Sequence, residues 1–175
     1  AMIGASSVVA VNSALTASGT DMTAAELAAL DDTTSGIITA TLVTGTIASF
    51  GAVTNDNGNN VITVTVNNTD SQVATLYSAL GGKTTGTVTA AGSLTMTGTT
   101  DEIIAAMIGA SSVVAVNSAL TASAADMTSA ELAALDDVTE GVITATLVTG
   151  NAASFSAMTN DHLNNVVTVN INDGD

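Results

Sequence analysis

The sequence contains no cysteine, proline or tryptophan, and Lys83 is the only basic side chain apart from His162 among its 175 residues. Without cysteine, the chain can form no disulfide, thiol nucleophile or cysteine-based zinc site. It has 16 acidic side chains and a formal net charge of −15. It therefore lacks the basic groups that displace counterions from phosphate, and we expect no nucleic-acid partner.

Aromatic residues are also scarce, at 2% of the chain, whereas hydrophobic residues make up 46% and charged residues 10%. Disordered acidic chains combine low hydrophobicity with high charge, so this composition predicts a folded chain. Its core must consist of Ala, Val, Ile, Leu and Met, with Thr along the edges. A thin core of small side chains favours a repetitive structure over one large globule.

An internal repeat is the strongest feature of the sequence. Residues 1–70 align without a gap on residues 106–175, and 53 of the 70 aligned positions are identical. We therefore divide the chain into a first repeat unit, residues 1–105, and a second, partial unit, residues 106–175. Residues 101–105 read as the start of a helix that continues through Ile108, so we expect residue 1 to lie inside an element of a longer array.

Each unit contains a shorter period. Segments of helical character recur at residues 1–4, 24–30, 47–53, 72–80, 102–108, 130–135 and 152–158. Their last apolar residues are 23 to 28 positions apart, and four consecutive steps span one unit of 105 residues. The spacing predicts four coils per unit, each of about 26 residues.

After each helical segment, a Gly- or Asn-marked turn leads into alternating apolar and polar residues, which is typical of a strand with one buried face. The predicted inner faces carry Ile38, Ala40 and Leu42, then Ile62, Val64 and Val66, then Val88 and Ala90, then Val114 and Val116. The predicted outer faces carry Thr39 and Thr41, Thr63 and Thr65, Thr87 and Thr89, and in the fourth coil Ala115 and Asn117.

These periods predict an α/β solenoid, in which a parallel β-strand stack carries one short helix per coil and both units form one continuous body. The alternative is a series of tandem β-sandwich repeats, because 105 residues would also suit an immunoglobulin-like domain. We favour the solenoid because the shorter period divides the unit into similar coils.

Helix start signals support the coil boundaries. Thr23 with Glu26, and Thr128 with Glu131, match the capping box, in which a hydroxyl and a carboxylate satisfy free N–H groups. Asp70 and Asp101 lie where helix N-caps are expected, and a negative charge there also interacts favourably with the helix dipole.

Acidic and amide residues cluster in the predicted turns. Calcium takes six to eight oxygen ligands from carboxylates, amides and carbonyls, so these turns are candidate calcium sites. The candidate ligands are Asp31, Asp32, Asp56, Asp70, Asp136, Asp137 and Asp161. The alternative is that Asp, Asn and Gly occur here because tight turns require them. No stretch fits an EF-hand loop or a calcium-binding nonapeptide.

The remaining features suggest no catalytic site. His162 replaces Asn57 of the first unit, and Lys83 lies outside any phosphate-binding motif. Tyr77, Phe50 and Phe155 lie on helical segments and are expected to pack in the core or at its edge. The apolar stretch of residues 103–120 contains Gly, Ser and Asn and fits the coil period, so we expect no membrane span. We therefore expect no enzyme activity and no required cofactor beyond possible Ca²⁺.

Two patterns resemble a known group of proteins. They are residues 25–41, Ala-Glu-Leu-Ala-Ala-Leu-Asp-Asp-Thr-Thr-Ser-Gly-Ile-Ile-Thr-Ala-Thr, and residues 79–90, with Thr97-Gly98-Thr99 after them. Both resemble the degenerate repeats of giant secreted cell-surface proteins of marine bacteria, cyanobacteria especially. Those proteins are similarly acidic, rich in Thr and Ala, and free of cysteine. The resemblance implies an extracellular location and a role in envelope structure, adhesion, motility or matrix, and it transfers no functional residue.

The sequence thus predicts a structural segment of a long extracellular protein that forms a fibre, stalk or surface layer. Its expected partner is itself, through end-to-end or lateral assembly and through adjacent repeats. One alternative is a calcium-dependent adhesin that binds its target elsewhere in the chain. A remote alternative is an ice-binding face formed by the Thr-x-Thr pairs, although Ala115 and Asn117 are expected to interrupt that ladder.

Overall fold

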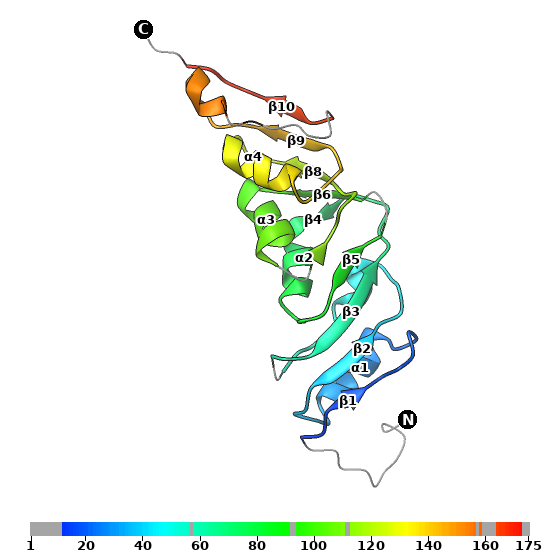
Figure 1. Ribbon diagram of the computed structural model, residues 1–175. Helices are drawn as coiled ribbons and strands as arrows, with labels where there is room; N and C mark the ends of the chain where they lie inside the picture. Colours follow the sequence, from blue (N-terminus) through cyan, green and yellow to red (C-terminus); the bar gives the residue numbers. More distant parts are fainter. Residues whose placement is uncertain are drawn as a thin grey trace.

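The computed structural model describes residues 12–56, 58–91, 94–110, 113–156, 158 and 164–172. Figure 1 shows their helices and strands following one another along an elongated axis, with β1 near the N-terminal end and β10 near the C-terminal end. The strands are β1 (Leu15–Thr16), β2 (Ile38–Thr41), β3 (Val61–Val66), β4 (Gln72–Val73), β5 (Val88–Ala90), β6 (Thr95–Gly98), β7 (Val113–Val114), β8 (Ala119–Ala122), β9 (Ile143–Thr146) and β10 (Val166–Thr168).

These strands form two sheets, and each pair of neighbouring strands in them is parallel. One sheet has the order β1-β2-β3-β5-β7, and the other has the order β10-β9-β8-β6-β4. Paired residues are separated by 22 positions (Thr39 with Val61) to 25 positions (Val88 with Val113). Each step across a sheet therefore advances the chain by about one predicted coil. The protein is an α/β fold with two parallel sheets. The sequence predicts a single stack of parallel strands and does not indicate the second sheet.

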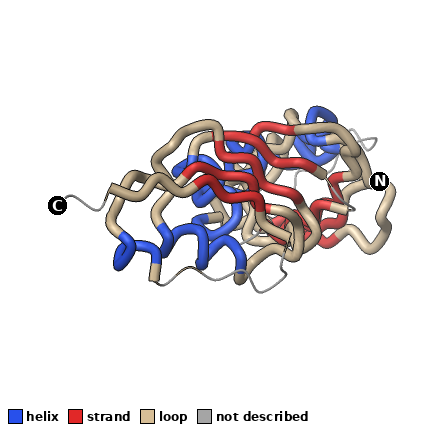
Figure 2. Tube along the Cα trace, turned by 90° about the horizontal axis from the view of Figure 1, so that it is seen from above, coloured by secondary structure: helices blue, strands red, loops and turns tan. Residues whose placement is uncertain are grey.

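Helical elements lie beside the strands (Figure 2). They are α1 (Ala24–Asp31), the 3₁₀ helix η1 (Ile47–Phe50), α2 (Ala74–Gly81), α3 (Thr100–Ile104), the π-helix η2 (Ala105–Gly109), α4 (Ser129–Asp136) and the 3₁₀ helix η3 (Ala152–Phe155). They confirm the predicted helical segments from residue 24 onward, whereas residues 1–4 lie outside the described part. We call each helical element together with the strand of the next turn a layer: α1–β2, η1–β3, α2–β5, α3/η2–β7, α4–β9 and η3–β10.

The repeat is reproduced in the structure. α1 and α4, β2 and β9, and η1 and η3 each begin 105 positions apart. The core is also as predicted for the first three strand segments, whose inner residues are all less than 10% exposed: Ile38, Ala40, Leu42, Ile62, Val64, Val66, Val88 and Ala90. Tyr77 and Phe50 are buried, and Phe155 packs against the core while partly exposed. The aromatic side chains therefore serve packing, as the sequence predicts.

The fourth predicted strand is wrong by one residue. Val113 and Ala115 are buried, at 7% and 2% exposed, whereas Val114 and Val116 are 41% and 44% exposed. The reason is the register, because Val113 pairs with Val88 and Val114 with Thr89. A shift of one residue moves every side chain to the opposite face of a strand. The π-helix before this strand, closed by Ala110 N–H on Ala105 O at 2.8 Å, is a wider turn that simple spacing does not anticipate.

Both predicted capping boxes are present. Glu26 N–H donates to Thr23 Oγ1 at 3.2 Å while Thr23 N–H donates to Glu26 Oε2 at 2.9 Å, and Thr128 with Glu131 repeats this arrangement. A third box, which the sequence does not lead us to predict, joins Thr99 to Glu102 at the start of α3.

The two predicted aspartate caps are wrong. The N-cap of α2 is Val73, and Asp70 lies three residues earlier, where it accepts a hydrogen bond from Asn68. The N-cap of α3 is Thr99, which places Asp101 in the first turn of that helix. Asp101 still lies near the positive end of the helix dipole. Within the part of the chain that the structure describes, no helix is long and apolar enough to cross a membrane.

Candidate functional site

Buried polar side chains connect successive layers, and they form the most distinctive polar arrangement in the described residues. Asp31, at the end of α1, is 5% exposed, and Asn60 is fully buried just before β3. Asn60 Nδ2 donates to Asp31 Oδ1 at 2.7 Å, and Asn60 Oδ1 accepts from the N–H of Ile38 at 2.8 Å. The Asn60 side chain thus binds both α1 and β2, the helix and the strand of the layer before its own.

The same arrangement recurs one repeat unit later. Asn165 Nδ2 donates to Asp136 Oδ1 at 2.7 Å, and Asn165 Oδ1 accepts from the N–H of Ile143 at 2.9 Å. Asp136 is 1% exposed. Because buried polar groups are costly unless they are hydrogen-bonded, each pair favours one register between its two layers.

A Thr-x-Gly turn follows each of the helices α1, α2 and α4 and makes a second kind of connection. The threonines Thr34, Thr84 and Thr139 are buried. Each hydroxyl accepts the N–H of the glycine two residues later, at 2.9 to 3.0 Å. Each also donates to a backbone carbonyl 21 or 22 residues earlier in the chain, namely Ser13 O at 2.8 Å, Ile62 O at 2.9 Å and Ser118 O at 2.7 Å.

Glycine is required in these turns because the backbone of the preceding layer lies against it. A Cβ atom on Gly86 would lie 2.5 Å from Ile62 O, and Gly36 and Gly141 meet Ser13 O and Ser118 O even more closely. The N–H of Ile62 donates to Thr84 Oγ1 at 2.7 Å, just as the N–H of Ile38 donates to Asn60 Oδ1. Thr84 and Asn60 therefore play the same part in their layers. We call Asp31, Thr34, Asn60, Thr84, Asp136, Thr139 and Asn165 the polar seam.

Sequence reasoning misses the polar seam, although a signal for it exists. Thr34-Ser35-Gly36, Thr84-Thr85-Gly86 and Thr139-Glu140-Gly141 each occur between a helical segment and a strand. Asn60 and Asn165 hold the corresponding position where no α-helix precedes the strand. The recurrence is visible in the sequence, but its partners lie 21 to 29 residues away, so the contacts themselves are not. The arrangement can fix the stacking of layers, and it holds no pair of groups suited to acid–base chemistry.

The predicted calcium ligands occupy three kinds of position. Asp31 and Asp136 are buried members of the polar seam, and Asp31 Oδ2 also accepts the N–H of Asp56 at 3.0 Å. Asp32 and Asp137 are exposed C-cap residues of α1 and α4. Asp56 and Asp70 lie on exposed turns, and Asp161 lies outside the described residues. The fold therefore brings Asp31 and Asp56 together, with Asp32 next to Asp31 in sequence.

No group of three or more His, Cys, Asp or Glu side chains that could hold a metal occurs within the described residues. The Asn68 side chain holds the pKa of Asp70 below its usual value by a hydrogen bond at 3.0 Å. The hydrogen bond favours the ionised form of Asp70, but its partner is the side-chain amide of Asn68 rather than another carboxylate. Calcium binding at these positions stays a prediction.

The outward faces of the sheets carry uncharged β-branched residues in register. In the second sheet, pairings place one row across five strands: Val73, Thr97, Thr121, Thr144 and Val166. In the first sheet, Thr65 and Thr89 are followed by Val114 rather than by Ala115, which is buried. Thr97 Oγ1 donates to Gln72 O at 3.3 Å, so part of this face is used in strand pairing. Ice binding stays a prediction.

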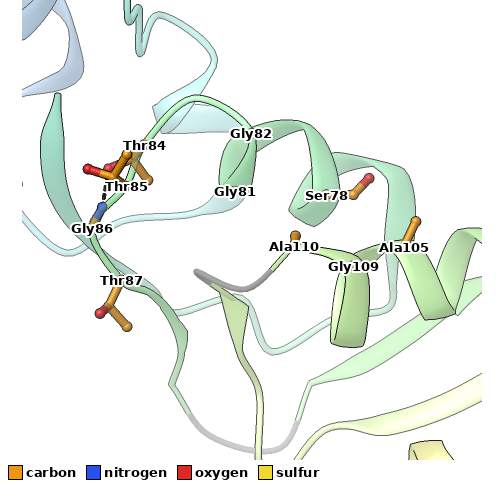
Figure 3. A pocket seen from close by; sticks show the side chains of 10 residues that line it. All are labelled: Ser78, Gly81, Gly82, Thr84, Thr85, Gly86, Thr87, Ala105, Gly109 and Ala110. Carbon is orange, nitrogen blue, oxygen red and sulfur yellow. Dashed lines mark hydrogen bonds between the residues drawn. The ribbon is translucent and has the colours of Figure 1, made fainter. Parts of the chain in front are cut away.

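A hollow of about 670 Å³ lies between the end of α2, the turn at Thr84–Thr87 and the end of η2 (Figure 3). Its lining residues are all Ser, Thr, Gly or Ala. Figure 3 also shows the hydrogen bond from Gly86 N–H to Thr84 Oγ1 that shapes its rim. Such a lining offers hydroxyl groups but no charged or basic group for catalysis.

The other residues considered from the sequence have structural positions. Lys83 Nζ donates to Gly51 O of the preceding layer at 3.3 Å. The Tyr77 side chain is buried, and burial, with a smaller effect from Asp70, raises its pKa to about 12. Its hydroxyl has no hydrogen-bond partner within the described part of the chain. His162 lies outside that part.

Comparison with known proteins finds no matching family model, curated protein or solved structure.

Proposed function

We propose that this chain is a structural segment of a long extracellular surface protein, and that it forms an α/β solenoid by stacking layers of about 26 residues. The observation that carries the proposal is the polar seam, which recurs 105 positions apart with the same Asp–Asn and Thr-x-Gly contacts. A device that fixes the stacking of one layer on the next has its use in a regular rod, a stalk or a surface layer.

The mechanism is geometric. One layer cannot bury its apolar strand face alone, and stacking buries a continuous core while it lengthens the rod. Residues 1–105 and 106–175 would then be two units of one continuous body rather than separate domains. The acidic surface, with a net charge of −15 on this chain, keeps neighbouring rods apart unless cations gather between them.

Electron microscopy of chains with increasing numbers of the 105-residue unit tests this proposal. We expect rods whose length increases linearly with the number of units at constant width. A matched control replaces Gly36 and Gly86 of the first unit by valine, and likewise the equivalent glycines of every further unit, such as Gly141. We expect this control to form no regular rods. Compact particles, or a width that grows with unit number, would contradict the proposal.

A calcium-dependent adhesin is the second candidate. The observation that favours it lies at the end of α1, where the Asp31 carboxylate accepts the N–H of Asp56 and the neighbouring residue Asp32 is exposed. This proposal predicts that a chelator lowers the melting temperature and that Asp32→Asn reduces the effect of added calcium. Asp101→Asn, on α3, is the control. An identical melting temperature with calcium and with chelator would exclude calcium as a structural ligand.

A further inference from the structure

The outer side of the first sheet carries no charged side chain. Alternate residues of its strands are buried in the core, and the residues between them are exposed or half-buried and point away from it: Thr39, Val61, Thr63, Thr65, Thr89 and Val114. We call these residues the neutral face. They lie in register, because Thr39 pairs with Val61, Thr65 with Thr89 and Thr89 with Val114. β2, β3 and β5 each have a paired strand on both sides, so this face belongs to the interior of the sheet and not to its ends.

Charge is confined to other parts of the molecule. None of the ten described strands contains an acidic or basic residue. The described acidic side chains lie instead on helices, as Glu26 and Glu131 do, or at helix ends and in turns, as Asp32 and Glu140 do. The buried sides of the strands and of the helices share one core, so the neutral face points away from the helices. A chain with a net charge of −15 thus has a side on which another body can approach without meeting carboxylates.

The neutral face also exposes apolar groups. Val61 and Val114 are 38% and 41% exposed, although both lie in paired strands. The threonines beside them each add a methyl group and a hydroxyl that can donate to, or accept from, a facing hydroxyl. Apolar groups that gather on one exposed face are typical of an interaction surface.

The repeat favours a second copy of this chain as the occupant of that surface. Thr39 and Thr41 of β2 recur 105 positions later as Thr144 and Thr146 of β9. In both strands the first threonine is exposed and the second is half-buried. A second copy presents the same rows at the same strand spacing of about 4.8 Å, and every further unit repeats the match. An unrelated partner would need this spacing and also a surface that tolerates the field of a strongly acidic chain.

We propose that the neutral face pairs with the neutral face of a second copy, so that two rods associate through their strands while their acidic helices and turns stay in solvent. The inference rests on the proposed structural function and names the surface through which neighbouring rods associate. The carboxylates orient the contact, because every approach through the helices or turns brings like charges together.

The size of the face sets the strength of the contact. Five parallel strands of about four residues each present about 300 Å² per partner. Pairing of one sheet on each partner would therefore bury about 600 Å² in total, less than the roughly 1,200–2,000 Å² of a stable interface. A short chain thus pairs weakly, and an array of several units pairs more tightly because the contacts along a rod act together.

Sedimentation equilibrium of the intact 175-residue chain tests the pairing. We expect reversible dimers that are more stable in about 0.15 M NaCl than in about 0.01 M NaCl, because salt screens the repulsion between the acidic sides. Thr39→Asp combined with Thr144→Asp adds a charge to both copies of the β2 strand. This variant should associate about tenfold or more weakly, because the added carboxylates would be buried in the contact.

The helices provide a matched control. Ala25 and Ala130 are exposed, lie 105 positions apart and belong to α1 and α4. Ala25→Asp combined with Ala130→Asp has the same formal charge as the strand variant, −17, but adds it outside the contact. We expect its association constant to stay within about threefold of that of the unchanged chain, because exposed charges interact weakly across water.

Lysine at the same positions separates burial of charge from net charge. Thr39→Lys combined with Thr144→Lys reduces the formal charge to −13, yet it too places charges in the contact, so we expect weaker association. Ala25→Lys combined with Ala130→Lys has the same charge of −13 and should leave association unchanged or strengthen it. Circular dichroism of each variant checks that it is folded, and the lysine pair keeps the test decisive if the aspartate pair does not fold.

Several results would overturn the proposal. They are the absence of association at chain concentrations up to about 1 mM, equal effects of the strand and helix variants, and association that follows net charge wherever the charge is placed. A monomeric chain that shapes growing ice crystals, and loses this effect in the strand variant, would instead show that the face binds ice.

Failure of the pairing is distinguishable from failure of the proposed function. If multi-unit chains form regular rods in about 0.01 M NaCl but the chain does not associate in about 0.15 M NaCl, stacking within a chain holds and pairing through the neutral face is wrong. If the chain pairs as expected while multi-unit chains form compact particles, the pairing holds and the rod is wrong.

Discussion

At the scale of single residues, the contact between layers depends on atoms that a conservative substitution would add or remove. Gly86 lies against the backbone of Ile62, whereas a Cβ atom on Gly82, four residues earlier, would make only an ordinary van der Waals contact, 3.5 Å from Ser78 O. Neither glycine has a positive φ. The two positions therefore differ in the space around them rather than in backbone conformation, which makes them a matched pair.

We predict that Gly86→Ala destabilises the chain by about 1–3 kcal/mol, because the added methyl group forces the backbones of two layers apart. Gly82→Ala, in the same turn, should change stability by less than about 0.5 kcal/mol. Urea unfolding followed by circular dichroism measures both. Equal effects of the two substitutions would contradict the role assigned to the close approach at Ile62.

The hydroxyl of Thr84 gives a second prediction. Valine has nearly the same shape as threonine, but it leaves the N–H groups of Ile62 and Gly86 without their acceptor. We expect Thr84→Val to cost about 1–3 kcal/mol, the range for leaving buried polar groups unpaired. Thr87→Val is the control, because the Thr87 side chain is exposed immediately before β5. Urea unfolding midpoints of the two variants should differ clearly in this direction.

At the scale of elements, the capping boxes connect helix stability to pH. The N–H and then the hydroxyl of Thr23 lower the pKa of Glu26 by hydrogen bonding to its carboxylate. Because the folded-state pKa is the lower one, this contribution is fully present above the unfolded value of about 4.3. It is lost as the pH falls through the folded-state pKa.

We therefore predict that acidification below about pH 4.3 changes the melting temperature less favourably in the wild-type chain than in Glu26→Gln, because only the wild-type chain loses the contribution of the ionised Glu26. The glutamine still presents an oxygen to the Thr23 N–H but cannot be protonated in this range. Glu140→Gln, which removes an exposed carboxylate outside any capping box, is the control. Melting curves between pH 2 and pH 7, a range that spans about two units on either side of that value, provide the measurement. An unchanged slope in Glu26→Gln would contradict the assignment.

The sequence indicates the helical segments and the first three inner faces because both depend on local periodicity. It does not indicate β1, β4, β6 and β8, since these strands show no regular alternation of buried and exposed residues. It misplaces Val114 and Val116 because the phase of that strand is set by its pairing with β5. The polar seam is missed for a related reason: Asp31 reads as an exposed ligand, and only the fold brings Asn60 to its carboxylate.

At the scale of the whole molecule, charge opposes the stacking that the apolar core and the polar seam favour. The 16 acidic side chains are opposed by a single lysine, which leaves a formal net charge of −15, so acidic side chains repel one another along the stack. Regular stacking and charge repulsion thus act on the same layers. Their balance depends on ionic strength, because screening shortens the range of the repulsion without changing the contacts in the core.

We predict that the melting temperature rises as NaCl increases from about 0.01 M to 0.15 M, where the screening length falls from about 30 Å to about 8 Å. A variant with Asp32→Asn, Asp137→Asn and Glu140→Gln, all exposed, has a formal charge of −12 and should show a smaller rise. Comparing NaCl with CaCl₂ at equal ionic strength separates screening from binding. Equal curves assign the effect to screening, and a further rise in calcium would support the adhesin candidate. A melting temperature that is flat or falls with NaCl would show that repulsion between layers does not limit the stability of the stack.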